Sequence, residues 1–243
     1  MSGQGGGEGN CRRHLQGCGQ DAQNRLTART SPGHPARAQP LAHCSAAADV
    51  APRLRMLIGD VEMVLLILGV LVWSGAHLFK RLLPAKRAAM GAAGKGVVAV
   101  ASLAGIVLMV IGYRSAPYIG VWTPPAFLTH VNNLLMLFAV FLLGIGNMWG
   151  MVRTKLRHPM LGAVKVWALA HLLVNGDLAS IILFGGLLAW AVVSLILINK
   201  AVPVWVRPAP GPVRNDVIFA GVSLLFYAAI AFIHTGLGVS PFG

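Results

Sequence analysis

Acidic side chains are scarce in this chain. Only seven of its 243 residues are Asp or Glu, and from Met63 onward only Asp177 and Asp216 remain. A hydrolase that works with two neighbouring carboxylates is therefore disfavoured. The same scarcity disfavours a cation-driven transporter, because such proteins usually place acids within the membrane and carry paired repeats.

Cysteine is missing from most of the sequence. Cys11, Cys18 and Cys44 all precede residue 56, and no CxxC or His/Cys cluster follows them. This argues against zinc and iron–sulfur sites in the rest of the chain. Near the N-terminus, Cys11, His14 and Cys18 could be read as zinc ligands, but their spacing matches no standard zinc module. Neither a Walker loop nor a GxGxxG motif at a strand end is present.

Charged residues are also few. They make up 11% of the chain, hydrophobic residues make up 56%, and the mean hydropathy is +0.69. That is the composition of a protein that spans a lipid bilayer, so the bilayer is the first expected partner. Basic residues outnumber acidic ones 20 to 7, but most of the excess lies between apolar segments. Because these residues form no stripe with interleaved aromatics, we expect no nucleic-acid partner.

Six apolar runs are long enough to cross about 30 Å of hydrocarbon. They show no alternation of period two, so the predicted fold class is an all-α bundle of about six transmembrane helices. Only residues 175–177 separate the fourth run from the fifth, which predicts a tight hairpin; a partly re-entrant hairpin would leave five spans. The predicted spans are residues 61–80, 96–113, 127–149, 159–175, 178–198 and 216–237.

Positive charge is distributed unequally among the connections between these spans. Residues 81–95, 150–158 and 199–215 carry ten of the 13 Lys and Arg that follow Met63, whereas the second connection carries Arg114 alone and the fourth carries none. Because positive charge resists translocation, the three basic loops are predicted to be cytoplasmic and the C-terminus periplasmic.

The N-terminal segment, residues 1–60, has a different composition. It is rich in Gly, Ala, Arg, Pro and Gln and lacks a sustained apolar run, which predicts a disordered basic tail before a transmembrane domain over 61–243. It does not have the pattern of a signal peptide. In the predicted topology its arginines would have to cross the membrane, so we expect the true start near Met56 or Met63. A genuine disordered tail is the alternative.

Histidines within the apolar spans are the first candidates for function, because ionisable groups in a membrane helix are costly and usually face the bundle interior. Depth follows from a rise of about 1.5 Å per residue. By this measure His130, His171 and His234 fall in one layer near the outer ends of their helices. His77 and His158 fall on the cytoplasmic side.

The fourth span carries Trp167, His171 and Asn175 at successive four-residue steps, so these three share one helix face. Neutral imidazole is a common axial ligand of haem iron, and helical bundles build cofactor sites from inward side chains on facing helices. The alternative is that these residues have no cofactor and serve only as hydrogen-bonding groups at the membrane interface or as packing groups. Lys165 could simply extend toward the cytoplasm. Of this set, His171 is the residue that topology explains least.

The segment VRTKLRHPMLGAVKVWALAHLLVNGDLAS resembles the signature of the NnrU membrane proteins. The stretches LGVLVWSGAHLF and IHTGLGVSPFG resemble the two ends of that family, so the resemblance covers roughly residues 61–243. It implies a bacterial inner-membrane protein associated with nitrite and nitric oxide metabolism in denitrification.

That family is similar to 15-cis-zeta-carotene isomerase, an integral membrane enzyme understood to carry haem b. The isomerase shares the RHPM sequence and the helical histidine at His171, and it has a histidine where His77 stands. The resemblance therefore implies haem b, with His77 and His171 as first ligands and His158 as a further site residue. The isomerase has a cysteine where this chain has Ala168, so the chain lacks a thiol that such a mechanism could use.

Depth separates the two implied ligands, since straight helices would hold His77 and His171 on the order of 10–15 Å apart. His130 or His234 is the alternative ligand opposite His171.

Three other functions stay open. The first is a non-catalytic accessory protein that contacts nitric oxide or nitrite reductase components. The second is an isomerase-like activity on carotenoids. The third rests on RHPML, which resembles a motif of the isoprenylcysteine methyltransferase type of enzymes that bind S-adenosylmethionine, although the acidic stretch and large cytoplasmic helix of those enzymes are missing. The identity of catalytic residues stays unknown at this level.

Overall fold

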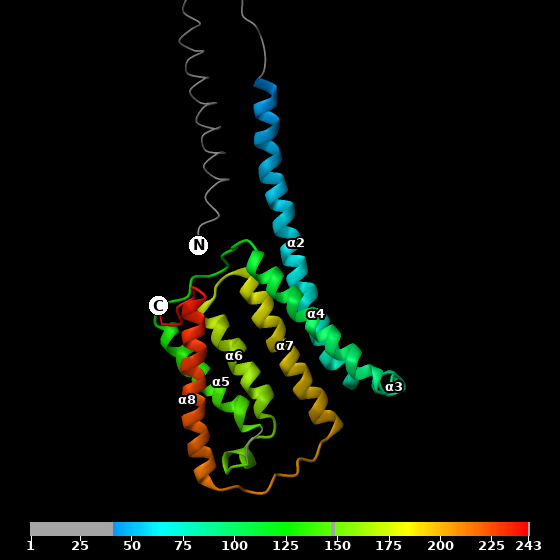
Figure 1. The fold of residues 1–243 in the computed structure, drawn as a ribbon, viewed down its shortest axis with the longest axis vertical. Coiled ribbons are helices and arrows are strands. Elements are labelled where there is room, and N and C mark those ends of the chain that lie inside the picture. The colour runs from blue at the N-terminus through cyan, green and yellow to red at the C-terminus, as the bar shows by residue number, and fades with distance from the viewer. Residues whose placement is uncertain (1–40, 147–148, 243) are drawn as a thin grey trace, which may run out of the picture. The chain divides into compact units, whose positions relative to one another are not determined.

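The computed structural model describes residues 41–146 and 149–242, with side chains from Gly59 onward. The chain divides into two units, Met1–Ala51 and Pro52–Gly243, and the account below concerns the second. The tail residues Cys11, His14 and Cys18 lie outside the described part. The helices in chain order are α2 (Leu41–Leu82), α3 (Pro84–Ala89), α4 (Ala93–Ser115), α5 (Leu128–Ile145), the 3₁₀ helix η1 (Val152–Lys155), α6 (Pro159–Val174), α7 (Leu178–Ala201) and α8 (Val213–Gly236) (Figure 1).

The six long helices match the six predicted spans. Five of them are long and apolar enough to cross a membrane. In the most apolar stretch of each of these five helices, at most 22% of the residues are buried within the protein. Apolar side chains left uncovered on this scale are what a bilayer would cover. The protein is therefore an all-α, multi-pass membrane protein. The sixth helix, α6, has 16 residues and a length of about 24 Å, short of a full span unless the bilayer is thin around it.

Two boundaries differ from the prediction. The helix α5 ends at Ile145, four residues early, next to Gly144 and Gly146, which are poor helix formers. The helix α2 begins at Leu41, within the segment predicted to be a disordered tail, although its apolar span begins only at Gly59. The short helices α3 and η1 were not predicted.

Close packing of α2 against α4 depends on three glycines. A Cβ atom at Gly105 would lie 2.8 Å from the backbone nitrogen of Trp73, and one at Gly69 would lie 2.6 Å from the backbone nitrogen of Met109. Gly112 approaches the backbone of Leu66 in the same way. Small residues at such positions let membrane helices approach until their backbones touch. Elsewhere α5 packs against α6 and α8, and α7 packs against α6 and α4.

The helix ends form two groups, which we name by their loops. At the hairpin end, the α4–α5 loop is joined to the α6–α7 turn: Val121 N–H donates to the Gly176 carbonyl at 2.8 Å, and Leu178 N–H donates to the Ile119 carbonyl at 2.8 Å. The basic end carries the other three connections, residues 83–92, 149–158 and 202–212. These loops and the helix turns that flank them contain 11 of the 13 Lys and Arg residues that follow Met63.

At the basic end, the start of α8 fastens the α5–α6 loop. The Asp216 carboxylate accepts a hydrogen bond from Met151 N–H at 2.8 Å, and the Asn215 amide donates to the Trp149 carbonyl at 2.7 Å. The backbone N–H groups at the start of η1 thus donate to a carboxylate on another helix.

Candidate functional site

Three of the predicted site histidines lie within about one turn of the hairpin end. His171 precedes the end of α6 by three residues, His234 precedes the end of α8 by two, and His130 is the third residue of α5. His171 and His234 are half-buried, whereas His130 is exposed. The structure therefore places His171 and His234 in the same layer of the bundle.

His171 lies in an aromatic pocket formed by α6 and α7. The ring of Phe184 stacks on the imidazole at a centroid distance of 4.5 Å and an interplanar angle of 28°. Trp167 flanks both rings, with its centroid 5.1 Å from each. Behind the histidine, the Asn175 side-chain amide donates to the His171 carbonyl at 2.8 Å, which adds to the bond that this carbonyl accepts from the Asn175 backbone N–H at 3.0 Å. Packing and hydrogen bonding thus fix the orientation of this ring.

The membrane histidines share one hydrogen-bond pattern. In His77, His171 and His234, the Nδ1 atom lies 2.8 to 2.9 Å from the backbone carbonyl four residues earlier. A carbonyl oxygen can only accept, so Nδ1 carries the proton in each neutral ring and Nε2 keeps its lone pair. Histidines that bind a metal usually donate their second ring N–H to such an acceptor. Each of the three can therefore offer Nε2 as a ligand.

His77 belongs to a different aromatic cluster, between α2 and α7. Its ring lies 4.0 Å from that of Trp73 and 5.6 Å from that of Trp190. Trp190 follows Phe184, the neighbour of His171, by six residues on α7. Six helical residues correspond to about 9 Å along the axis and about 120° around it. The structure therefore places His77 and His171 at different levels and on different faces of α7, so they do not form one ligand pair.

His158 lies at the basic end. Its Nε2 donates to the Asn199 amide oxygen at 2.9 Å, and the neighbouring Arg157 guanidinium donates to the Val202 carbonyl. Pro159 then begins α6 at the position where a missing N–H costs least. The RHP sequence thus joins the start of α6 to the end of α7. Thirteen residues, or about 20 Å of helix, separate His158 from His171.

A second polar group at the hairpin end was not predicted. Asp177 caps α7 by accepting from Ser180 N–H at 2.9 Å and from the Ser180 hydroxyl at 2.6 Å. Since that hydroxyl has donated its only proton, the Tyr113 hydroxyl 2.9 Å away must donate to it. Ser180 is fully buried, and the Tyr113 ring lies 6.3 Å from that of Phe184. The sequence offered one signal, an Asp three residues before a Ser at a helix start.

The histidines near the hairpin end could offer one or two ligands to a cofactor. In the described ranges, 41–146 and 149–242, no three His, Cys, Asp or Glu side chains gather as they would in a multi-ligand metal site. A porphyrin supplies four ligands to its iron and needs only one or two from the protein. Two half-buried imidazoles with free Nε2 atoms, His171 and His234, meet that requirement.

Comparison with known proteins identifies a family. The family model described as NnrU protein matches residues 65–241. No curated protein and no solved structure matches the chain.

Proposed function

Because the chain belongs to the NnrU family, as its RHPM, WALAHLL and NGD sequences predicted, we propose that it binds haem b within the membrane through His171. We place its activity in nitrite and nitric oxide metabolism at a bacterial inner membrane, with the basic loops in the cytoplasm and the C-terminus in the periplasm. The observation that carries the proposal is the His171 ring, which is oriented by the Trp167 carbonyl at 2.9 Å and by Phe184 stacking, with Nε2 left as a lone-pair donor.

His234 is the residue we propose as the second ligand. It shares the depth of His171, and its Nδ1 donates to the Ile230 carbonyl at 2.8 Å. His77, the ligand implied by the related isomerase, also has a free lone pair on Nε2. It lies on α2, however, and packs beside Trp190, at a different level of α7 from the neighbour of His171. His171 on α6 and His234 on α8 would then hold the group at the hairpin end, where both helices finish.

Each surrounding side chain has a defined part in this arrangement. The Trp167 carbonyl fixes the tautomer of His171, and the Asn175 amide holds the backbone carbonyl of the same residue. Trp167 and Phe184 pack around the imidazole and reduce the access of water. Haem b held there would supply an iron centre for one-electron chemistry, which the interconversion of nitrogen oxides requires.

The experiment is an absorption spectrum of protein purified from cells with ample haem. The wild type should show a Soret band, and His171→Ala should remove it. His234→Ala should weaken or shift the band, while His158→Ala, at the basic end, should leave it unchanged. A wild type that stays colourless, or a His171→Ala spectrum equal to that of the wild type, would contradict the proposal.

An accessory role, in which the protein supports a nitric oxide or nitrite reductase through contacts alone, makes the opposite prediction for activity in cells. Under that role His171→Ala supports denitrification as well as the wild type does. An isomerase mechanism that uses a cysteine thiol on α6 is not available to this chain, because the fully buried Ala168 occupies that position.

A further inference from the structure

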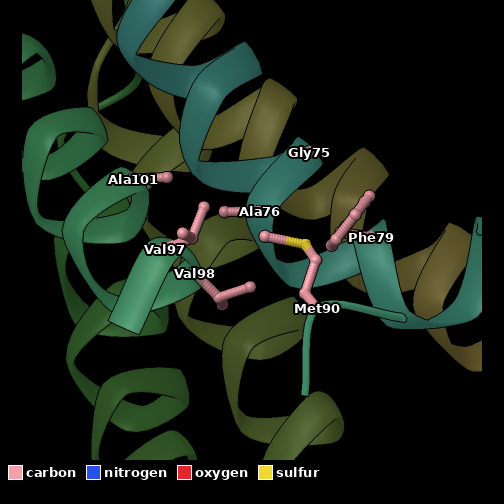
Figure 2. Close-up of a pocket in the computed structure, with 7 residues that line it drawn as sticks. All are labelled: Gly75, Ala76, Phe79, Met90, Val97, Val98 and Ala101. Carbon is pink, nitrogen blue, oxygen red and sulfur yellow. The ribbon is translucent and has the colours of Figure 1, made fainter. Parts of the chain in front are cut away.

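An apolar groove lies at the basic end, where α2 approaches its last turn and α4 begins. Its volume is about 210 Å³. Figure 2 shows the Met90 side chain reaching from the α3–α4 connection toward Ala76, with the α4 residues on the facing side. The lining residues are Gly75, Ala76, Phe79, Met90, Val97, Val98 and Ala101. The groove is therefore a space between two membrane helices near their water-facing ends.

The groove is open because several of its lining residues are small. At Gly69 and Gly105 the two backbones touch, and no side chain would fit between them. At Gly75, six residues further along α2 and about 120° around it, a Cβ atom would meet nothing within 4 Å. The small residues at 75, 76 and 101 leave the groove unfilled.

Positive charge is concentrated in the part of the chain next to this groove. Lys80, Arg81, Lys86, Arg87 and Lys95 lie in or beside the α2–α4 connection, and the sequence has no acid between Glu62 and Asp177. The Arg87 guanidinium donates to the Gly91 carbonyl at 3.2 Å. It also lies against Gly94 on the side where Met90, a lining residue, packs. A fixed cation thus stands beside the apolar opening.

We propose that this groove is a binding site for an anionic phospholipid, with one acyl chain in the groove and the headgroup phosphate on the cations of the α2–α4 connection. The apolar lining suits a chain, and the uncompensated positive charge at the boundary with water selects a negative headgroup over a zwitterionic one. Basic pockets between membrane helices recognise anionic lipid headgroups on the same principle. The site is separate from the His171 region and does not depend on haem.

The experiment uses the full chain in nanodiscs that contain equal amounts of phosphatidylglycerol and phosphatidylcholine with identical acyl chains. Native mass spectrometry of the released protein then measures which lipid is retained. The wild type should retain phosphatidylglycerol preferentially. The double variant Arg87→Gln with Lys95→Gln should bind it about 30-fold more weakly, because each cation near an anionic surface contributes about 1 kcal/mol and 1.4 kcal/mol is tenfold in affinity.

Filling the groove should have the same effect without changing charge. Gly75→Leu should abolish the preference, whereas Gly221→Leu, at a glycine on α8 that also has open space around it, should retain it. Lys200→Gln with Arg207→Gln, in the last turn of α7 and the loop that follows it at the same end, should retain it as well. If Gly75→Leu does not fold, Ala101→Phe fills the groove from α4. Equal retention of the two lipids by the wild type, or an undiminished preference in a folded groove-filling variant, would overturn the proposal.

Discussion

The glycine contact between α2 and α4 allows a prediction with a calculable magnitude. In Gly105→Ala, the new Cβ would lie 2.7 Å from the Trp73 Cβ, 2.8 Å from its backbone nitrogen and 3.0 Å from the Gly69 carbonyl oxygen, where ordinary contacts are 3.4–4 Å. Two of these three atoms belong to the backbone, so no rotamer change relieves the clash. The helices must move apart, which typically costs about 1–3 kcal/mol.

Gly96→Ala is the matched control on the same helix, since a Cβ atom there meets nothing within 4 Å. Both substitutions gain the same preference for helix, about 0.5–1 kcal/mol. That gain cancels in the comparison, and Gly105→Ala should therefore be less stable than Gly96→Ala by about 1–3 kcal/mol.

The assay is reversible unfolding of purified protein by titration with a denaturing detergent, monitored by tryptophan fluorescence. Gly96→Ala should unfold at or above the wild-type midpoint and Gly105→Ala clearly below it. Equal midpoints for the two variants would show that the backbones do not touch at this crossing. The positions of Trp73 and His77 relative to α4 would then need revision.

Three further predictions concern the ends of the bundle. In a double-mutant cycle, Tyr113→Phe and Ser180→Ala should show a coupling free energy of about 0.6 kcal/mol, typical of hydrogen bonds between membrane helices, and additive effects would refute the Tyr113 to Ser180 bond. Asp216→Asn should lower the unfolding free energy by about 1 kcal/mol through loss of its charge-assisted bonds to the start of η1, measured in the same titration, and an unchanged midpoint would refute that contact. With the native cysteines replaced by serine, Tyr118→Cys should react with an impermeant maleimide in intact spheroplasts and Arg207→Cys only after lysis; the reverse pattern would invert the predicted topology.

The sequence predicted the number of spans and their order well, because hydropathy over about 20 residues is a local property. The charge of the loops likewise predicted which connections lie at the same end of the bundle. The hydrogen bond from Val121 to Gly176 joins the two connections with little charge, and the bond from Met151 to Asp216 joins a basic loop to the helix that follows another basic loop. Depth along each helix is also local, and it separated His77 from His171 before any contact was known.

Lateral contacts could not be predicted in this way. Nothing near Phe184 in the sequence indicates that its ring stacks on His171, and Tyr113 and Ser180 lie 67 residues apart. Which helices are neighbours depends on small-residue contacts such as that of Gly105 with Trp73, and any pair of six spans could have formed one. For this reason depth along the helices admits both His130 and His234 as a second ligand beside His171.

The most direct test of the central claim is chemical rescue at His171. His171→Gly leaves space for a free imidazole, which can occupy the position of the lost side chain and offer the same nitrogen. The wild type should show a Soret band, His171→Gly should lack it, and added imidazole should restore it in His171→Gly but change nothing in His158→Gly. A wild type without the band, or a His171→Gly variant that keeps it without imidazole, would contradict the assignment of His171 as the haem ligand.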